Sequence, residues 1–212
     1  FSKPSMADNL LRALDMGVEV VGGIPHLDPT YELGQESIRI LTNLAAERGL
    51  MVDLHCDEND APNSRLLETL VYETTRLDLT GRVTGSHLTS MHSMDNFYGA
   101  RLVKLIAAAG VHVAANPLAN MFLQGRFDTY QKRRGLTRIP ELLEAGALVA
   151  MGHDSVLDPW YPLGRADMLD VAFMAVHASH MSSRTALPQT FQCVTELPAA
   201  IKGLEGYGLG EG

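Results

Sequence analysis

The chain has 212 residues, of which 46% are apolar and 20% are charged, and its formal net charge is −8. This length is enough for one domain with a substantial core, and the absence of a basic stripe argues against nucleic-acid binding. No apolar stretch approaches the ~20 residues that span a membrane, and no signal peptide is visible. Two cysteines, Cys56 and Cys193, are too few for a disulfide framework, so we expect a cytoplasmic protein.

Hydrophobic periodicity predicts a regular alternation of helices and strands. Helices are expected where apolar residues recur every three or four positions, and strands where short apolar runs end at glycine, proline or polar residues. In chain order we predict a helix at 5–16, a strand at 18–24, a helix at 35–48, a strand at 50–55, a helix at 64–78, a strand at 82–87, a helix at 96–109, a strand at 111–115, a long loop at 117–137, a helix at 138–145, a strand at 147–152, and helices at 165–180 and 187–202.

This series of five strand–helix units predicts an α/β fold with a parallel sheet. The glycine-rich motifs of nucleotide-binding folds are absent. A complete (β/α)8 barrel has about 250 residues. The chain starts at Phe1 rather than Met, and residues 207–212 resemble a turn that leads onward. We therefore expect residues 1–212 to be a single-domain fragment, the C-terminal five-eighths of a (β/α)8 TIM-type barrel, comprising about strands 4 to 8.

Residues typical of a metal-dependent hydrolase stand at the ends of three predicted strands. His55 ends one strand, with Glu58 three residues later; His87 ends the next strand, and Asp154 follows the last. Parallel α/β folds place their chemistry at these carboxyl ends. Imidazole and carboxylate groups bind zinc or iron, and a carboxylate beside an activated water can carry protons. His87 could ligate a metal or polarise a substrate carbonyl.

Each of these residues also has a structural interpretation. A histidine at a strand end is often only hydrogen-bonded, Asp57 could be a turn residue, and an Asp after a strand could cap the next helix. Trp160 could line a pocket or cover the core. Segment 124–127 is a candidate substrate lid, and the basic run 132–134 a solvated face or an oligomer contact. The remaining histidines are interpreted as structural: His26, His92, His112, His153, His177 and His180.

The order of these residues along the chain resembles the amidohydrolase superfamily, and within it the bacterial cytosine deaminases. The segments that carry the resemblance are 20–26, 55–58, 81–87, 115–118, 123–130, 152–154 and 158–164, so it extends over nearly the whole chain. It implies a distorted (β/α)8 barrel with one divalent ion, Fe²⁺ or Zn²⁺. His55 and Asp154 would bind the ion, Glu58 would shuttle protons, His87 would steady the attacking water, and Trp160 would line the pocket.

The chain departs from the family pattern in two ways. The His-x-His metal ligands and a substrate-reading Gln would have to lie before Phe1. We therefore do not expect this chain alone to bind metal tightly or to turn over. Ser155 stands where the family usually has an Asp that faces the substrate, which leaves the identity of the substrate open.

These observations favour a hydrolytic deaminase of an amino-heterocycle, with cytosine, giving uracil and ammonia, as the first candidate substrate in pyrimidine salvage. Isocytosine, a modified cytosine or an aminotriazine is the alternative that Ser155 favours. A truncated, non-catalytic partial barrel is the alternative from another class. The expected partners are a small amino-heterocycle and water, with no nucleic acid or membrane, and the resemblance implies a homo-oligomer.

Overall fold

A computed structural model describes residues 4–208 and contains one five-stranded sheet. The strands are β1 (Val20–Gly23), β2 (Met51–Cys56), β3 (Val83–His87), β4 (His112–Ala115) and β5 (Val149–Met151), and all four neighbouring pairs are parallel. Their spatial order is the order of the chain, β1 to β5. A doubly wound sheet reverses its strand order, whereas a barrel does not. The predicted α/β class and barrel-type winding are thus confirmed.

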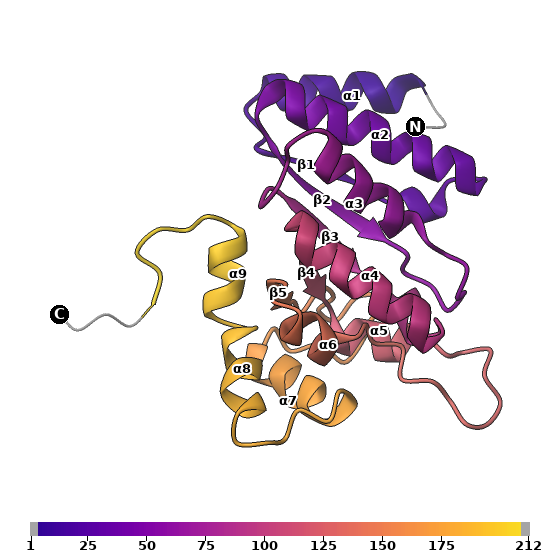
Figure 1. Ribbon diagram of the computed structural model, residues 1–212, viewed down its shortest axis with the longest axis vertical. Coiled ribbons are helices and arrows are strands. Elements are labelled where there is room, and N and C mark those ends of the chain that lie inside the picture. The colour runs from indigo at the N-terminus through magenta and orange to yellow at the C-terminus, as the bar shows by residue number, and fades with distance from the viewer. Residues whose placement is uncertain (1–3, 209–212) are drawn as a thin grey trace.

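The helices that connect the strands form a layer along one face of the sheet (Figure 1). They are α2 (Tyr31–Arg48), α3 (Leu66–Arg76), α4 (Asn96–Ala109) and α6 (Ile139–Glu144), preceded by α1 (Pro4–Asp15). Their limits follow from the sequence. Thr30 and Asp95 cap the N-termini of α2 and α4 through side-chain oxygens, and Gly49 and Gly110 end these helices in the left-handed conformation.

The two faces of the sheet differ in chemistry, which decides where the site can form. In β2 the buried residues Val52, Leu54 and Cys56 alternate with Asp53 and His55, which are only half-buried. Alternate residues of a strand point to opposite faces. The apolar set lies in the main core, so Asp53 and His55 lie on the opposite, concave face of the sheet.

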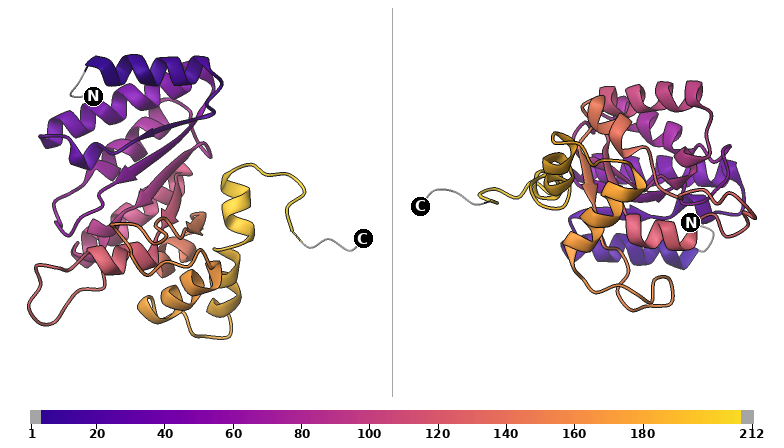
Figure 2. Two further views of the ribbon diagram at one scale, coloured as in Figure 1. Left: turned by 180° about the vertical axis from the view of Figure 1, so that it is seen from behind. Right: turned by 90° about the horizontal axis from the view of Figure 1, so that it is seen from below.

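The last three helices gather at the opposite end of the sheet from α1, as Figures 1 and 2 show. They are α7 (Met168–Ala178), α8 (Ala186–Gln192) and α9 (Glu196–Ile201). The connection between α8 and α9 meets β5, where the backbone N–H of Met151 donates to the carbonyl of Cys193 (2.7 Å). None of the helices in the described part of the chain has both the length and the apolar character needed to cross a membrane.

Two predicted elements were wrong. The segment predicted as one loop from 117 to 137 begins with helix α5 (Pro117–Leu123), because Pro117 occupies the first helical turn, where a missing N–H costs no hydrogen bond. The predicted helix 187–202 is two helices, α8 and α9. Pro198 lies in the first turn of α9 and so marks a helix start rather than a helix interior. The predictions about Phe1 and residues 209–212 fall outside the described residues.

Candidate active site at the carboxyl end of the sheet

His55, Glu58 and His87 converge at the carboxyl end of β2 and β3. One ligand atom from each lies within 4.8 Å of the others. Because Cys56 is in register with His87, the two strand ends hold the imidazoles side by side, with His87 Nε2 3.1 Å from His55 Nδ1. The Glu58 Oε1 atom lies 3.2 Å from His87 Nδ1. Imidazole and carboxylate groups are donor types that bind a zinc or ferrous ion, and of these three residues only His55 was predicted as a metal ligand.

Glu58 lies in a half-buried position that favours its protonated form. Burial of the carboxyl, followed by the charge of Asp154, raises the pKa of Glu58 to about 7. A carboxyl group that changes protonation near neutral pH can both give and take protons. Its electrostatic surroundings are therefore those of a proton carrier.

His87, in contrast, is held neutral. Burial, followed by the neighbouring rings of His55 and His26, lowers the pKa of His87 to about 3. The contact with Glu58 is consequently not an ion pair at neutral pH. A neutral imidazole has one donor and one acceptor nitrogen, so the role of His87 depends on which nitrogen carries the proton.

Asp57, which the sequence left open as a turn residue, fixes the segment that carries Glu58. Its buried carboxylate accepts hydrogen bonds from the backbone N–H groups of Leu66 (3.0 Å) and Leu67 (2.9 Å) and from Ser64 Oγ (2.8 Å). It therefore caps α3 from nine residues away. Its carbonyl accepts the backbone N–H of Ser90 (3.0 Å). Glu58 thus directly follows a residue whose side chain and backbone carbonyl are both hydrogen-bonded to other segments.

Asp154 lies beyond the end of β5 and outside the three-residue group. Its side chain is exposed, and it acts on the group through its charge, which raises the pKa of Glu58. Ser155 is buried, and its backbone N–H donates to the carbonyl of His153 (2.6 Å). Trp160 is 60% exposed, so it lines no closed pocket within the described residues.

Three of the residues named here have unusual backbone conformations. Asp57, His87 and Asp154 have φ angles of 52°, 72° and 57°. Positive φ is uncommon for residues with a side chain, although Asp and His tolerate it better than most. Each of these residues stands where a strand ends, and the left-handed turn redirects the chain at that point.

Three further residues, of which Asn120 was not named from the sequence, also contact the group. Asn120, on α5, places its amide Nδ2 2.9 Å from His87 Nδ1. The amide of Asn116 lies 3.4 Å from both nitrogens of the same ring. His26 Nδ1 lies 2.9 Å from the carbonyl oxygen of His55, so it supports the end of β2 as a structural histidine. The Asn116-Pro117 pair at the end of β4 is recognisable in the sequence. Asn120 was not expected beside it, because residues 117–137 were predicted to be a loop rather than to begin with a helix.

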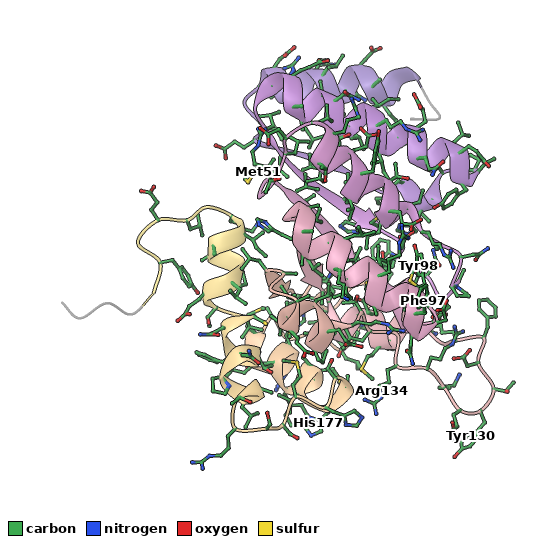
Figure 3. The ribbon with its side chains drawn as sticks, viewed as in Figure 1. Met51, Phe97, Tyr98, Tyr130, Arg134 and His177 are labelled. Carbon is green, nitrogen blue, oxygen red and sulfur yellow. The ribbon has the colours of Figure 1, made fainter. Side chains whose placement is uncertain are left out.

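The segment from Gln124 to Leu136 projects from the molecule at the same end (Figure 1). Phe127 and Tyr130 are 97% and 92% exposed, and Figure 3 shows Tyr130 at the outer end. The basic run within it is more than a solvated face. Arg133 binds the Asp128 carboxylate (2.7 Å) and the carbonyl of Asp60 (3.0 Å), and Arg134 binds the carbonyl of Ala178.

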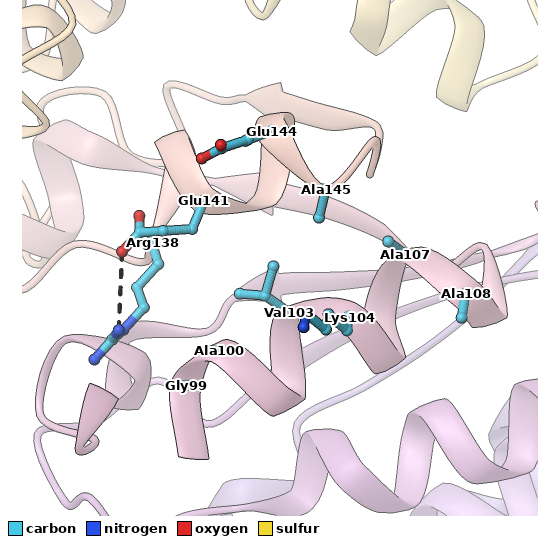
Figure 4. Close-up of a pocket in the computed structure, with 10 residues that line it drawn as sticks. All are labelled: Gly99, Ala100, Val103, Lys104, Ala107, Ala108, Arg138, Glu141, Glu144 and Ala145. Carbon is cyan, nitrogen blue, oxygen red and sulfur yellow. Dashed lines mark ion pairs between the residues drawn. The ribbon is translucent and has the colours of Figure 1, made fainter. Parts of the chain in front are cut away.

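A groove of about 660 Å³ lies elsewhere, between α4 and α6 (Figure 4). Small residues of α4, among them Gly99, Ala100 and Ala107, form its floor. Arg138 and Glu141 pair across one end of it (3.8 Å). None of the residues of the candidate active site lines this groove, so we attribute it to incomplete packing within the helical layer.

Comparison with known proteins agrees with this geometry. Residues 2–212 match the Amidohydrolase family. The chain belongs to this family. Its fold is that of a 5-methylcytosine deaminase from Klebsiella pneumoniae, solved with 5-fluorocytosine, with a TM-score of 0.94 and 41% sequence identity over 99% of this chain and 51% of that one.

Two other similar proteins are named for compounds other than 5-methylcytosine. A pterin deaminase from Rhizobium rhizogenes (strain K84 / ATCC BAA-868) is 32% identical over 89% of this chain and 42% of its own length. An N-isopropylammelide isopropylaminohydrolase from Burkholderia multivorans shares 26% identity and a TM-score of 0.81 over 99% of this chain and 50% of that one. The chain thus spans about half the length of the relatives that it matches.

Proposed function

We propose that this chain is part of a metal-dependent amidohydrolase that removes an amino group from a heterocycle. The observation that carries the proposal is the convergence of His55, Glu58 and His87 at the carboxyl end of a parallel sheet. The 41% identity to a 5-methylcytosine deaminase supports a cytosine-type pyrimidine as the substrate. In the reaction a ring carbon forms a bond to a water oxygen and loses its amino group as ammonia.

The roles proposed for the side chains are those that the family resemblance implies, and the convergence of His55, Glu58 and His87 supports them. His55 and Asp154 would hold a single Fe²⁺ or Zn²⁺ ion, which would activate water for attack. Asp154 would accept the proton of that water. Glu58, with its pKa raised to about 7, would give a proton to the ring nitrogen and then to the leaving amine. His87 would hydrogen-bond to the water, and Trp160 and Ser155 would contact the ring.

The substrate could also be another amino-heterocycle. Ser155 presents a hydroxyl where an Asp is usual in cytosine deaminases, and a hydroxyl can donate a hydrogen bond that a carboxylate cannot. The relatives named for pterin and N-isopropylammelide widen the range to be tested. Ammonia release from cytosine, 5-methylcytosine, isocytosine, pterin and an aminotriazine would rank these substrates by kcat/KM. If the intact protein that contains this chain were inactive on all five, the result would contradict the proposal and favour a non-catalytic partial barrel.

Substitution of Glu58 tests the proton-carrying role. In the intact protein that contains this chain, we expect Glu58→Ala to abolish turnover and leave the metal bound. Loss of a general acid–base group typically costs 10²–10⁴ in rate. Ammonia release and metal content would be measured on the same preparation, with Glu47→Ala, an exposed position on α2, as the matched control. Retained turnover would remove Glu58 from this role.

A further inference from the structure

The backbone N–H of Asn116 determines which end of the Asn120 amide is the oxygen and which is the nitrogen. Asn120 is fully buried, one helical turn after Asn116. Its Oδ1 atom lies 3.3 Å from the backbone nitrogen of Asn116. A backbone N–H only donates, so the oxygen of the amide must face it. The flipped amide would set two donors against each other.

This polarity determines what Asn120 offers to His87. If Oδ1 faces Asn116, the other arm of the amide is Nδ2, which lies 2.9 Å from His87 Nδ1. An amide nitrogen only donates, so Nδ1 must accept with its lone pair. A neutral imidazole carries its single proton on the other nitrogen. The proton of His87 is therefore on Nε2, which lies toward His55 (3.1 Å).

We infer that Asn120 is a positioning residue that fixes His87 as its Nε2–H tautomer. This inference rests on the proposed function for its catalytic meaning, but the tautomer itself is a property of the fold. With Nδ1 engaged by Asn120 and Nε2 protonated, neither nitrogen of His87 is free to ligate a metal. His87 is thereby a hydrogen-bond donor to the water or to a substrate oxygen, although its distances to His55 and Glu58 resemble those of a ligand.

One contact competes with this arrangement. Glu58 Oε1 lies 3.2 Å from His87 Nδ1, and an ionised carboxylate there would favour a proton on Nδ1. The Asn120 contact is shorter, and the backbone N–H of Asn116 independently fixes Asn120 as the donor in it.

Gly152 also helps to keep Asn116 beside the His87 ring. A Cβ at this position would lie 2.4 Å from Asn116 Oδ1 and would displace the Asn116 side chain from the ring.

The tautomer can be measured without any reference to turnover. Histidine labelled with ¹⁵N in the intact protein gives long-range ¹H–¹⁵N correlations whose pattern distinguishes a proton on Nε2 from a proton on Nδ1. We expect the Nε2–H pattern for His87, assigned by its loss in His87→Gln. A proton on Nδ1 in the unsubstituted protein would overturn the inference and would make the Glu58 contact the dominant one.

Substitution of Asn120 by Asp keeps the shape of the side chain and replaces the amide donor that faces His87 Nδ1 with a carboxylate oxygen. A carboxylate accepts, so we expect Asn120→Asp to move the proton of His87 to Nδ1 and to lower kcat by about 100-fold with little change in KM. Asn9→Asp, an exposed position on α1, is the control. An unchanged tautomer would overturn the inference, as would a kcat loss that merely follows a lower melting temperature. A shifted tautomer with no activity on any heterocycle would instead contradict only the proposed function.

Discussion

At the scale of single residues, the site depends on short polar side chains that satisfy the backbone of other segments. Asp57 shows this most clearly, because its carboxylate accepts three hydrogen bonds from the start of α3 while its carbonyl binds Ser90. The residue that directly precedes Glu58 is thus tied to two different elements. The position of Glu58 therefore depends on the capping of a helix as well as on its contact with His87.

We expect Asp57→Ala to lower the free energy of unfolding by about 2 kcal/mol. The change removes the cap of α3, a loss of this order, because the N–H groups of Leu66 and Leu67 no longer have an acceptor. Urea denaturation would measure the loss against Asp8→Ala, an exposed position on α1. A difference of less than a few tenths of a kcal/mol between the two variants would show that α3 does not depend on this cap.

The sequence led to His55, Glu58 and His87 because each stands at or just after the end of an apolar run, and strand ends meet at one edge of a parallel sheet. It did not lead to Asn120 or to the contact that His26, interpreted as structural, makes with β2. Asn120 lies on α5, which was not predicted because the glycines and charges of residues 124–135 led us to interpret the whole of 117–137 as a loop. The His26 contact is a side-chain-to-backbone bond across 29 residues, which no local pattern records.

At the scale of elements, the projecting segment 124–136 is anchored at its base to the loop after β2. Asp60 accepts the backbone N–H of Gly125 (2.9 Å), and its carboxylate also contacts His92 Nε2 (2.9 Å). Arg133 adds a bond to the Asp60 carbonyl and pairs with Asp128. Residues 124–127, which were predicted as a substrate lid, are therefore connected through Asp60 to the loop that carries Glu58.

We expect Arg133→Ala to loosen this segment and to speed chymotryptic cleavage at Phe127 and Tyr130 by about tenfold. Both side chains are already exposed, so cleavage depends on local opening of the backbone, and loss of about 1.4 kcal/mol of anchoring increases opening tenfold. The time course of cleavage would be compared with that of Arg165→Ala, which removes an exposed ion pair with Asp170. Equal rates for the two variants would refute the anchoring.

At the scale of the whole molecule, the sequence predicted all five strands, their order and, apart from α5, the helices between them. This succeeded because buried parallel strands form continuous apolar runs and because glycines such as Gly49 and Gly110 end the helices. The region after β5 was predicted less well. Its helices are short, and their boundaries are set by tertiary contacts such as that between Met151 and Cys193, which the hydrophobic pattern does not reveal.

The strand order also predicts which strands of the sheet have backbone amides that are best protected from hydrogen exchange. In the 212-residue chain β3 has a strand on either side, whereas β1 pairs only with β2 among the described residues. We expect the backbone amides of β3 to exchange with deuterium more slowly than those of β1, because opening an edge strand breaks fewer bonds. Hydrogen exchange followed by mass spectrometry would resolve the two segments. Equal protection would mean that the outer side of β1 is covered.

The left-handed conformations of Asp57, His87 and Asp154 have a consequence for how this protein can change. Glycine adopts positive φ without the cost of about 1 kcal/mol that other residues carry, so the backbone alone would favour glycine at all three positions. At Asp57 the lost helix cap costs more than glycine would recover, and at His87 glycine would leave a buried cavity, so the argument applies to the exposed Asp154. A variant that melts at a higher temperature because Asp154 has become glycine is expected to have lost the metal ligand proposed above, so a stabilising library should keep this residue fixed.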